Sequence, residues 1–407
     1  MISALVGIVT GLAVAGFERL TVNLVFDRGV SQLPLWLLAF APGVGLAVAG
    51  LWLRGPGGGL PPATADSYLQ AFHSGRGLGF MEMIHRMVAS LATLGSGSAM
   101  GLEGPSIYLG ATLGSVVQRR FPKLLRGADM NLLLVAGAAA GIAAIFKAPA
   151  TGAIFAIEVP YQDDLARRVL LPALVAAGTG YVSFVAVNGT GRLFPLHGSA
   201  PLSFVDLAGA LGLGLAAGIG ARTFAWLLRH AKAAATSHHA MLRIGAAGLS
   251  IAGLFAIGRA LTGQSLVLTP GYSVVTWALA PQRAVELLLA VLVLRCLATS
   301  AAVAGGGVGG LFVPLVVAGA LLGRAFGIVV GGSQSLFLVV GIAAFLGAGY
   351  RVPLAAVMFV AETTGRPGFV VPGLIAAVVA ELTMGRVSVT AYQATPTSGP
   401  PDDARGR

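Results

Sequence analysis

Long apolar tracts with almost no charged residues recur along the whole chain, and they restrict the fold more than any other feature. Examples are Leu35–Leu53, Leu132–Ile157, Val285–Ala304 and Val308–Val330. Each is long enough to cross a hydrocarbon core of about 30 Å, and about eleven such tracts can be counted. Only 10% of the 407 residues are charged, compared with roughly a quarter in soluble domains. The sequence therefore predicts an all-α integral membrane protein with many passes.

The formal net charge of +11 has a simple explanation in this setting. Most basic residues lie in short loops, for example Arg119, Lys123, Arg229 and Arg243. This distribution is typical of the cytoplasmic loops of membrane proteins. It also attracts anionic membrane lipid and concentrates anions near a pore mouth. We therefore expect lipid and a small inorganic anion as partners, and no nucleic acid.

Glycine and proline interrupt the apolar tracts. The chain has 59 Gly and 21 Pro, and many of them fall inside the tracts, where they shorten or break helices. Non-helical backbone at membrane depth is tolerated only where it is buried in protein or lines a polar cavity. The interruptions are therefore the places at which a transport site is expected, above all if they recur in both halves.

Two interrupted segments do recur. The segment from Gly101 to Gly114 can be laid on that from Gly310 to Gly323 so that three glycines and one proline coincide. The stretch from Leu134 to Glu158 can be laid on that from Leu338 to Glu362 without a gap. Two independent matches in the same order indicate that the chain consists of two related halves.

We interpret the halves, about 1–195 and 200–393, as parts of one membrane domain that spans 1–393. Residues 394–407 form a polar, Pro-rich segment without an apolar pattern, which is typical of a disordered tail. The repeat pattern by itself leaves open whether the halves have parallel or inverted orientations in the membrane.

In each half a Gly-x-x-x-Pro segment precedes a run compatible with a helix, namely Gly101–Pro105 and Gly310–Pro314. Proline fits the first turn of a helix, because its missing N–H has no intrahelical partner there. The free N–H groups of such a turn, with the positive end of the helix dipole, favour bound anions. Two helix starts that face each other can hold an anion without a full positive charge, which permits its release.

These segments resemble the signature segments of the CLC family of chloride channels and proton-coupled chloride transporters. The resemblance rests on Gly101–Pro105, Gly310–Pro314, Phe146–Pro149 and Arg351–Pro353, and runs from about Gly11 to Gln393. It implies a CLC-like bundle of tilted and broken helices in two inverted-topology repeats. It further implies a homodimer with one anion pathway per subunit, in a bacterial plasma membrane. The resemblance implies chloride as the transported substrate, and it implies no cofactor.

Carried over by this resemblance, Glu103 matches the gating glutamate, whose carboxylate competes with chloride for the same N–H groups. An acid at membrane depth is costly and usually functional. The anion-binding backbone is expected in two short segments around the helix starts. Its residues are Gly101, Leu102, Gly104, Leu311, Phe312 and Val313.

Three departures from the family pattern affect the expected anion site. Gly58 stands where the family often has a serine, which removes a hydroxyl donor and affects selectivity. Leu102 replaces the basic residue that usually precedes the gate, and Lys147 either restores this cation or extends to the membrane interface. The pathway tyrosine near the C-terminus corresponds to Tyr392 or to its rival Thr390.

A fourth departure concerns protons. The exchangers of the family carry a second glutamate after the position of Glu158, and this chain has Val159 there. Since valine cannot relay a proton, the sequence favours weak or absent proton coupling. The alternative is an antiporter with a non-standard inner proton site, for which Asp163, Asp164 and Glu82 are candidates.

Three more buried polar residues, Glu158, Glu362 and Arg295, are expected to pair with backbone or with one another. Other function classes fit the sequence less well. A hydrolase lacks a nucleophile with a base at membrane depth, so we expect no enzyme. A nucleotide-driven pump lacks the phosphate-binding loop. The nearest rival is a fluoride exporter, which typically carries Asn at the position of Gly58.

Overall fold

The structure is a computed structural model that describes all residues except 126–128, 192, 195–202, 237–238 and 396–407. The described residues form sixteen α-helices and no strands. The helices are α1 (Ile2–Glu18), α2 (Leu35–Arg54), α3 (Ala65–Ser74), α4 (Phe80–Gly95), α5 (Glu103–Arg120), α6 (Leu132–Phe146), α7 (Pro149–Glu158), α8 (Leu170–Asn188), α9 (Phe204–Ala235), α10 (Ala240–Thr262), α11 (Tyr272–Ala278), α12 (Val285–Ala304), α13 (Phe312–Val329), α14 (Gln334–Tyr350), α15 (Pro353–Thr364) and α16 (Val370–Met384).

Within the described chain, seven helical segments are long and apolar enough to cross a membrane, and four shorter apolar helices accompany them. The tract Val285–Ala304 coincides with α12. The tract Leu132–Ile157 is not one spanning helix, because it breaks between α6 and α7 at Lys147 and Ala148. Lys147 adopts a left-handed backbone conformation (φ 53°), which ends α6 and allows Pro149 to begin α7.

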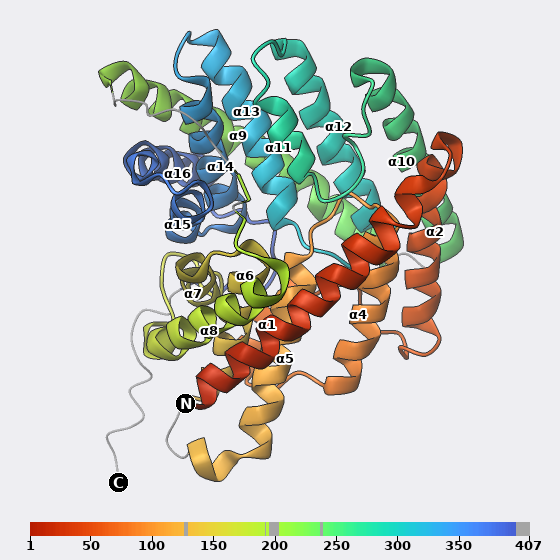
Figure 1. The fold of residues 1–407 in the computed structure, drawn as a ribbon, viewed down its shortest axis with the longest axis vertical. Coiled ribbons are helices and arrows are strands. Elements are labelled where there is room, and N and C mark those ends of the chain that lie inside the picture. The colour runs from red at the N-terminus through yellow and green to blue at the C-terminus, as the bar shows by residue number, and fades with distance from the viewer. Residues whose placement is uncertain (126–128, 192, 195–202, 237–238, 396–407) are drawn as a thin grey trace.

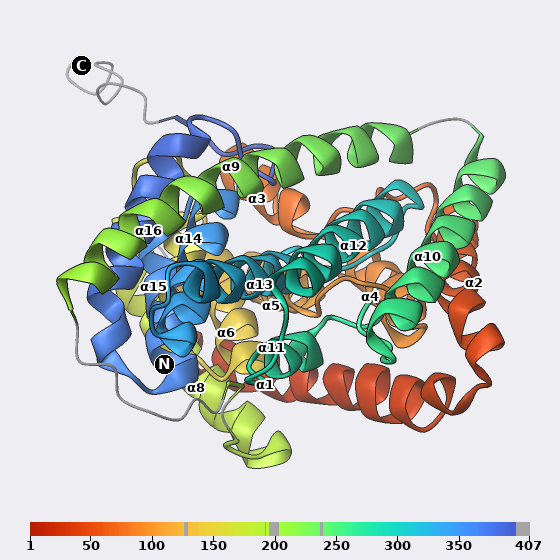
Figure 2. The same cartoon turned by 90° about the horizontal axis from the view of Figure 1, so that it is seen from above.

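The two halves of the sequence occupy different parts of the molecule. Helices α5 to α8 lie in the lower part of Figure 1 and α13 to α16 in the upper part, with α5 and α13 in contact between them. Seen from above, α13 runs through the middle of the molecule, with α1 and α9 on opposite sides (Figure 2). The predicted junction of the halves lies largely outside the described residues.

Glycines allow the same close helix contact in both halves. In the first half, a Cβ on Gly137 of α6 would stand 1.9 Å from the carbonyl oxygen of Gly110 on α5. In the second half, a Cβ on Gly341 of α14 would stand 2.3 Å from the carbonyl oxygen of Gly319 on α13. The repeated glycines therefore bring two helix backbones into direct contact, and a larger residue at either position would separate them.

Two carboxylates join the two halves by accepting hydrogen bonds from the first turns of helices. Glu158, at the end of α7, accepts hydrogen bonds from the N–H groups of Leu354 (3.1 Å) and Ala355 (2.8 Å) at the start of α15. Glu362 on α15 accepts from Ala150 (2.9 Å) and Thr151 (2.7 Å) at the start of α7. Each helix thus caps the other, which confirms the prediction that these acids pair with backbone.

Arg295 of α12 is also paired as predicted. Its guanidinium donates to a row of backbone carbonyls in the segment before α11, including those of Leu268 (2.9 Å) and Thr269 (2.8 Å). The two terminal nitrogens of this buried cation thus have carbonyl partners, and these bonds hold the non-helical segment in place. The partners of Glu158 and Arg295 are therefore backbone groups, and Glu362 accepts from the Thr151 hydroxyl (2.6 Å) in addition to its backbone partners.

The glycine contact gives a stability prediction. We expect Gly137→Ala to lower the free energy of unfolding by about 2 kcal/mol or more, because the added methyl group overlaps the Gly110 carbonyl. The matched control is Gly178→Ala on α8, where an added Cβ meets nothing within 4 Å. Thermal unfolding in detergent should show a clearly lower midpoint for Gly137→Ala only. Equal midpoints would contradict the close contact.

Candidate anion site

The two predicted helix breaks meet at the centre of the molecule. Gly101 and Gly310 form an antiparallel backbone pair, in which Gly101 N–H donates to Gly310 C=O (2.9 Å) and Gly310 N–H donates to Gly101 C=O (2.7 Å). Non-helical backbone at this depth needs partners from the protein, and each break supplies them to the other. The starts of α5 and α13 are thereby fixed next to each other.

The carboxylate of Glu103 lies on the first turn of α13. Its Oε1 atom accepts hydrogen bonds from the N–H groups of Phe312 (2.6 Å) and Val313 (3.3 Å). The Glu103 side chain is only 1% exposed. Since these N–H groups have no helical acceptor and carry the positive end of the dipole, a buried negative charge is stabilised there. The carboxylate occupies a place that suits any small anion.

The glycines of the backbone pair make room for this carboxylate. A Cβ on Gly310 would stand 2.1 Å from Glu103 Oε1, and a Cβ on Gly101 would stand 1.8 Å from Oε2. Gly104, the residue after Glu103, is also tightly packed, because a Cβ there would meet the Thr64 hydroxyl at 2.6 Å. Gly101 and Gly310 are thus explained by the close approach of the Glu103 carboxylate, and Gly104 by that of Thr64.

One oxygen of Glu103 is left unused. Among the described residues, Oε2 is buried and has no hydrogen-bond partner. A buried carboxylate oxygen without a donor is unfavourable, whereas both oxygens of Glu158 and of Glu362 accept hydrogen bonds. Glu103 is therefore held less completely than the two acids that cap helices.

Aromatic rings enclose the start of α13. Phe312 contacts Phe146 (centroids 4.3 Å apart), Phe359 (4.9 Å) and Phe155 (5.6 Å). These residues come from α6, α7 and α15, and all four are buried. The cluster keeps the α13 amides in an apolar environment, which strengthens their interaction with an anion.

A cavity of about 340 Å³ leads to the same helix start from one side of the molecule, and we call it the vestibule. Its lining includes Gly310, Leu311, Tyr350 and Thr64. Thr64 immediately precedes α3, its side chain makes no capping bond to that helix, and it is 3% exposed. Its hydroxyl is thus a donor close to Gly104 that the sequence analysis missed.

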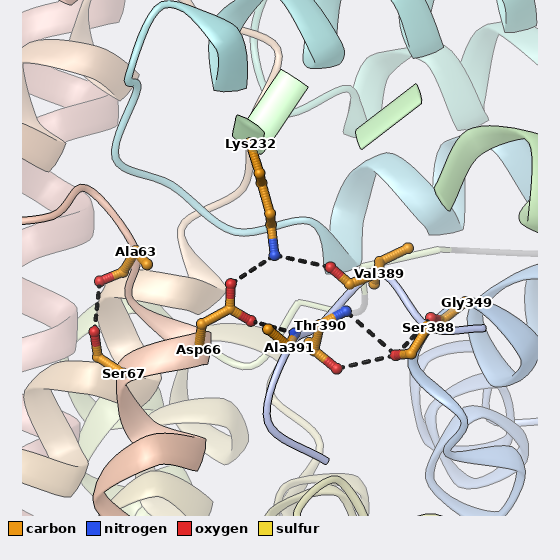
Figure 3. A network of polar contacts seen from close by, with 9 residues as sticks. All are labelled: Ala63, Asp66, Ser67, Lys232, Gly349, Ser388, Val389, Thr390 and Ala391. Carbon is orange, nitrogen blue, oxygen red and sulfur yellow. Dashed lines mark hydrogen bonds and ion pairs between the residues drawn. The ribbon is translucent and has the colours of Figure 1, made fainter. Parts of the chain in front are cut away.

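An ion pair stands in the wall of the vestibule. Lys232 Nζ of α9 donates to Asp66 Oδ2 (2.6 Å) and to the carbonyl oxygen of Val389 (2.9 Å), while Asp66 Oδ1 accepts from Ala391 N–H (2.9 Å). Figure 3 shows Lys232 directed between the acid and the C-terminal segment. The ammonium neutralises an acid that would otherwise repel anions.

Three further residues that the sequence predicts for the site, Gly58, Lys147 and Leu102, have different surroundings. Gly58 is exposed in the turn after α2, and is not part of the vestibule lining. Lys147 donates to the Gly191 carbonyl oxygen (3.1 Å) and interacts electrostatically with Glu18. Leu102 is 2% exposed and directly precedes α5. Among the described residues, the contacts of Lys147 thus lie at the end of α1 and just beyond the end of α8, and they do not include Glu103.

The C-terminal candidates both line the vestibule. Tyr392 is 56% exposed and has a positive φ of 69°, whereas Thr390 is half-buried, with its hydroxyl 3.0 Å from that of Ser388. Ala394, the first residue of the predicted tail, pairs with the backbone of Pro160 and Gln162. Residues 396–407 of that tail lie outside the described residues.

A second cavity, of about 270 Å³, lies beside Glu158. It is lined by Asp163, Arg351 and Glu381, and Arg351 pairs with Asp163 (2.8 Å) and Glu381 (3.5 Å). The neighbouring Val159 is buried at 2% exposure. Glu82, the other acid considered above, is exposed on α4.

The fold agrees with comparisons to known proteins. The chain belongs to the voltage-gated chloride channel family, whose model matches residues 58–385. A protein of Ralstonia nicotianae described as a ClcB-like chloride channel protein is 30% identical, over 94% of this chain and 92% of its own length. The H(+)/Cl(-) exchange transporter ClcA of Citrobacter koseri is 28% identical, over 92% of this chain and 82% of its own length.

A solved structure has the same architecture. The crystal structure of a CLC-type fluoride/proton antiporter matches with a TM-score of 0.83 at 23% identity, over 97% of this chain and 96% of that one. The resemblance and the predicted CLC-like fold are therefore confirmed, and the chain is a multi-pass membrane protein of an anion-transporting family.

The ion pair in the vestibule gives a testable prediction. We expect Lys232→Met to lower anion flux by about fivefold at low salt, because Asp66 then faces the vestibule as an uncompensated negative charge. The double variant with Asp66→Asn should recover most of the flux, and Lys232→Arg should keep it. Flux assays in proteoliposomes at two ionic strengths measure this. An equal loss in the single and the double variant would exclude the electrostatic explanation.

Proposed function

We propose that this protein transports chloride or a similar small anion across the membrane, through the amides at the start of α13 and under the control of Glu103. The observation that carries the proposal is the position of the Glu103 carboxylate on the N–H groups of Phe312 and Val313. A carboxylate and a chloride ion both need these donors, so the side chain has to leave, or lose its charge, before an anion binds.

The partial charges of the donors at this site favour transport of an anion over its permanent binding. Its donors are backbone N–H groups with partial charges, and the lysines considered above have other partners. Binding by partial charges is favourable but weak enough to allow release, which conduction requires. The vestibule connects the site to one side of the molecule, and the buried aromatic cluster limits the pathway around it.

Gating by Glu103 predicts that anion flux depends on pH in the wild-type protein and that this dependence is lost when the carboxylate is replaced. Protonation removes the charge of Glu103, so anion flux should rise as the pH falls. Glu103→Gln is neutral at every pH and should give flux that no longer responds to pH, at least severalfold above the wild-type level near neutrality. The matched control is Glu82→Gln, an exposed acid on α4. Full pH dependence in Glu103→Gln would show that another group gates the pathway.

Weak or absent coupling to protons is the second part of the proposal. It rests on Val159, an apolar and buried residue at the position where exchangers of this family carry a glutamate. Stoichiometric exchange needs a group that alternates between solution and Glu103, and valine has no proton to give. Channel-like anion movement is consistent with the name of the ClcB-like relative.

The alternative is an antiporter with a non-standard inner proton site, and one observation favours it. Glu158 lies directly beside Val159 and faces the cavity that Asp163, Glu381 and Arg351 also line. The acidic side chains of this cavity are candidate proton carriers, although both oxygens of Glu158 already accept hydrogen bonds from α15. ClcA, named as an exchange transporter, and the fluoride/proton antiporter are also similar to this chain, so fluoride is an alternative anion.

One measurement separates the two forms of the proposal. In vesicles clamped at zero voltage, we expect that an outward chloride gradient moves no protons uphill. The control is the same gradient with a protonophore, which defines the baseline. Sustained uphill pumping would make the protein an exchanger, and its loss in Glu158→Gln or Glu381→Gln would then locate the inner site. Replacing chloride by fluoride tests the alternative substrate.

We also propose that the protein works as a homodimer, with a separate pathway in each subunit, in a bacterial plasma membrane. The complete gate and vestibule come from a single chain, which is consistent with one pathway per subunit. The relatives named above are bacterial.

A further inference from the structure

Helix α1 is continued by a second kind of helix. After Glu18 the chain forms a π-helix, η1 (Arg19–Asp27), of nine residues. In this geometry the hydrogen bonds connect residues five apart, and most π-helices are single turns inside α-helices, often at functional sites. A run of nine residues is therefore unusual. With α1 it forms one apolar stretch, Ile2–Gln32, that is long enough to cross a membrane.

The π-helical winding decides which side chains share a face. In an α-helix, with about 3.6 residues per turn, the steps from Arg19 to Arg28 make about two and a half turns and place the two arginines on opposite sides. A π-helix has more than four residues per turn, so the same steps make about two turns and bring Arg28 back to the side of Arg19. Both arginines accordingly line one recess of about 480 Å³, which we call the arginine recess. Its other lining residues are Leu20, Asn23 and Leu24.

The opposite side of η1 is packed against the protein. A Cβ on Gly95, at the end of α4, would stand 2.7 Å from Val25. A Cβ on Gly97, in the non-helical run that leads to α5, would stand 2.8 Å from Phe26. Thr21 is 1% exposed. One side of η1 thus supports the segment before the helix break, and the arginine recess lies on the side that faces away from it.

The arginine recess lies at the outer surface, near one face of the membrane. Leu20 and Leu24 are 41% and 52% exposed. In Figure 2 the segment that leads from α1 to α2 runs along the outer edge of the molecule. Shortly after Arg28 the chain turns into α2, the next segment that can cross a membrane. Trp36, 67% exposed on the first turn of α2, is a residue type that is enriched at the membrane interface.

The two arginines of the recess have different surroundings. Arg19 Nε donates to Asn188 Oδ1 (2.8 Å) at the end of α8, which fixes the guanidinium. Arg28 is exposed and forms no hydrogen bond or ion pair with any residue that the structure describes. Glu18 and Asp27, the acids nearest in the sequence, are not among the lining residues. The recess therefore combines two positive charges with no acidic side chain.

We propose that the arginine recess binds the headgroup phosphate of an anionic phospholipid, and that the bound lipid holds η1 in place. The guanidinium of Arg28 has the planar donor geometry that suits a phosphate, and the Asn23 amide adds a further donor. Arg19 contributes charge from a fixed position. The exposed side chains of Leu20 and Leu24 are the apolar surface for the acyl chains. A zwitterionic lipid is disfavoured because it brings its own cation to a recess that has no acid.

Native mass spectrometry of the whole chain in detergent, with added phosphatidylglycerol or phosphatidylcholine, tests this site. We expect the wild-type protein to retain phosphatidylglycerol more strongly. Arg28→Gln should weaken this binding about fivefold, because it removes one cation that attracts an anionic lipid. Asn23→Leu is a second variant, with a smaller expected loss. The matched control is Arg54→Gln, which removes an exposed arginine from the last turn of α2, outside the recess.

Thermal unfolding gives an independent measurement. A lipid that binds the folded state raises the unfolding midpoint. Phosphatidylglycerol should therefore raise the midpoint of the wild-type protein and of Arg54→Gln, and should raise that of Arg28→Gln clearly less. Without lipid the three midpoints should be equal, because both arginines are exposed.

Three results would overturn the inference. The first is equal retention of phosphatidylglycerol by Arg28→Gln and Arg54→Gln, and the second is equal retention of the two lipids by the wild-type protein. The third is release of phosphatidylglycerol by millimolar inorganic phosphate, which would identify a site for free anions instead of a lipid site. None of these measurements depends on anion flux, so the inference goes beyond the proposed function and is tested separately from it.

Discussion

The backbone pair between Gly101 and Gly310 is the contact on which the rest of the site depends. At membrane depth every backbone N–H and C=O needs a partner from the protein, and broken helices leave several without one. Here the two breaks satisfy each other, so neither needs water or a side chain at that point. The pairing fixes the starts of α5 and α13, and Glu103, the first residue of α5, then reaches the amides of Phe312 and Val313. A separation of the two breaks would remove gate and site together.

The same interaction, a carboxylate on a helix start, occurs three times with different consequences. Glu158 and Glu362 use both oxygens, and each joins the two halves as a cap. Glu103 uses one oxygen, and the other is buried without a donor among the residues described. Release of any of these acids costs at least two hydrogen bonds to a charged group, about 3 kcal/mol or more, but only the release of Glu103 also relieves a buried oxygen that has no donor. This difference separates Glu103, the proposed gate, from the two structural acids.

The sequence predicts the part of the site that consists of backbone. The Gly-x-x-x-Pro repeats indicate where helices begin, and the start of a helix alone fixes which N–H groups are free. Side-chain donors could not be predicted in the same way, because they depend on which loop reaches the site. The Gly-rich turn drew attention to Gly58, yet Thr64, at the start of the next helix, lines the vestibule.

The positive net charge of the chain does not show that basic side chains bind the anion. The net charge is +11, but the cations near the centre are engaged: Arg295 and Arg324 donate to carbonyls beside α11, and Lys232 pairs with Asp66. Carbonyl oxygens thus accept hydrogen bonds from the two arginines and a carboxylate neutralises Lys232, while the amides of α13 are the donors of the proposed anion site. A buried ammonium facing the anion would bind it too tightly for rapid release. On the proposed function, cations that bind structural oxygens and a pathway that carries only partial charges let a strongly basic protein release an anion rapidly.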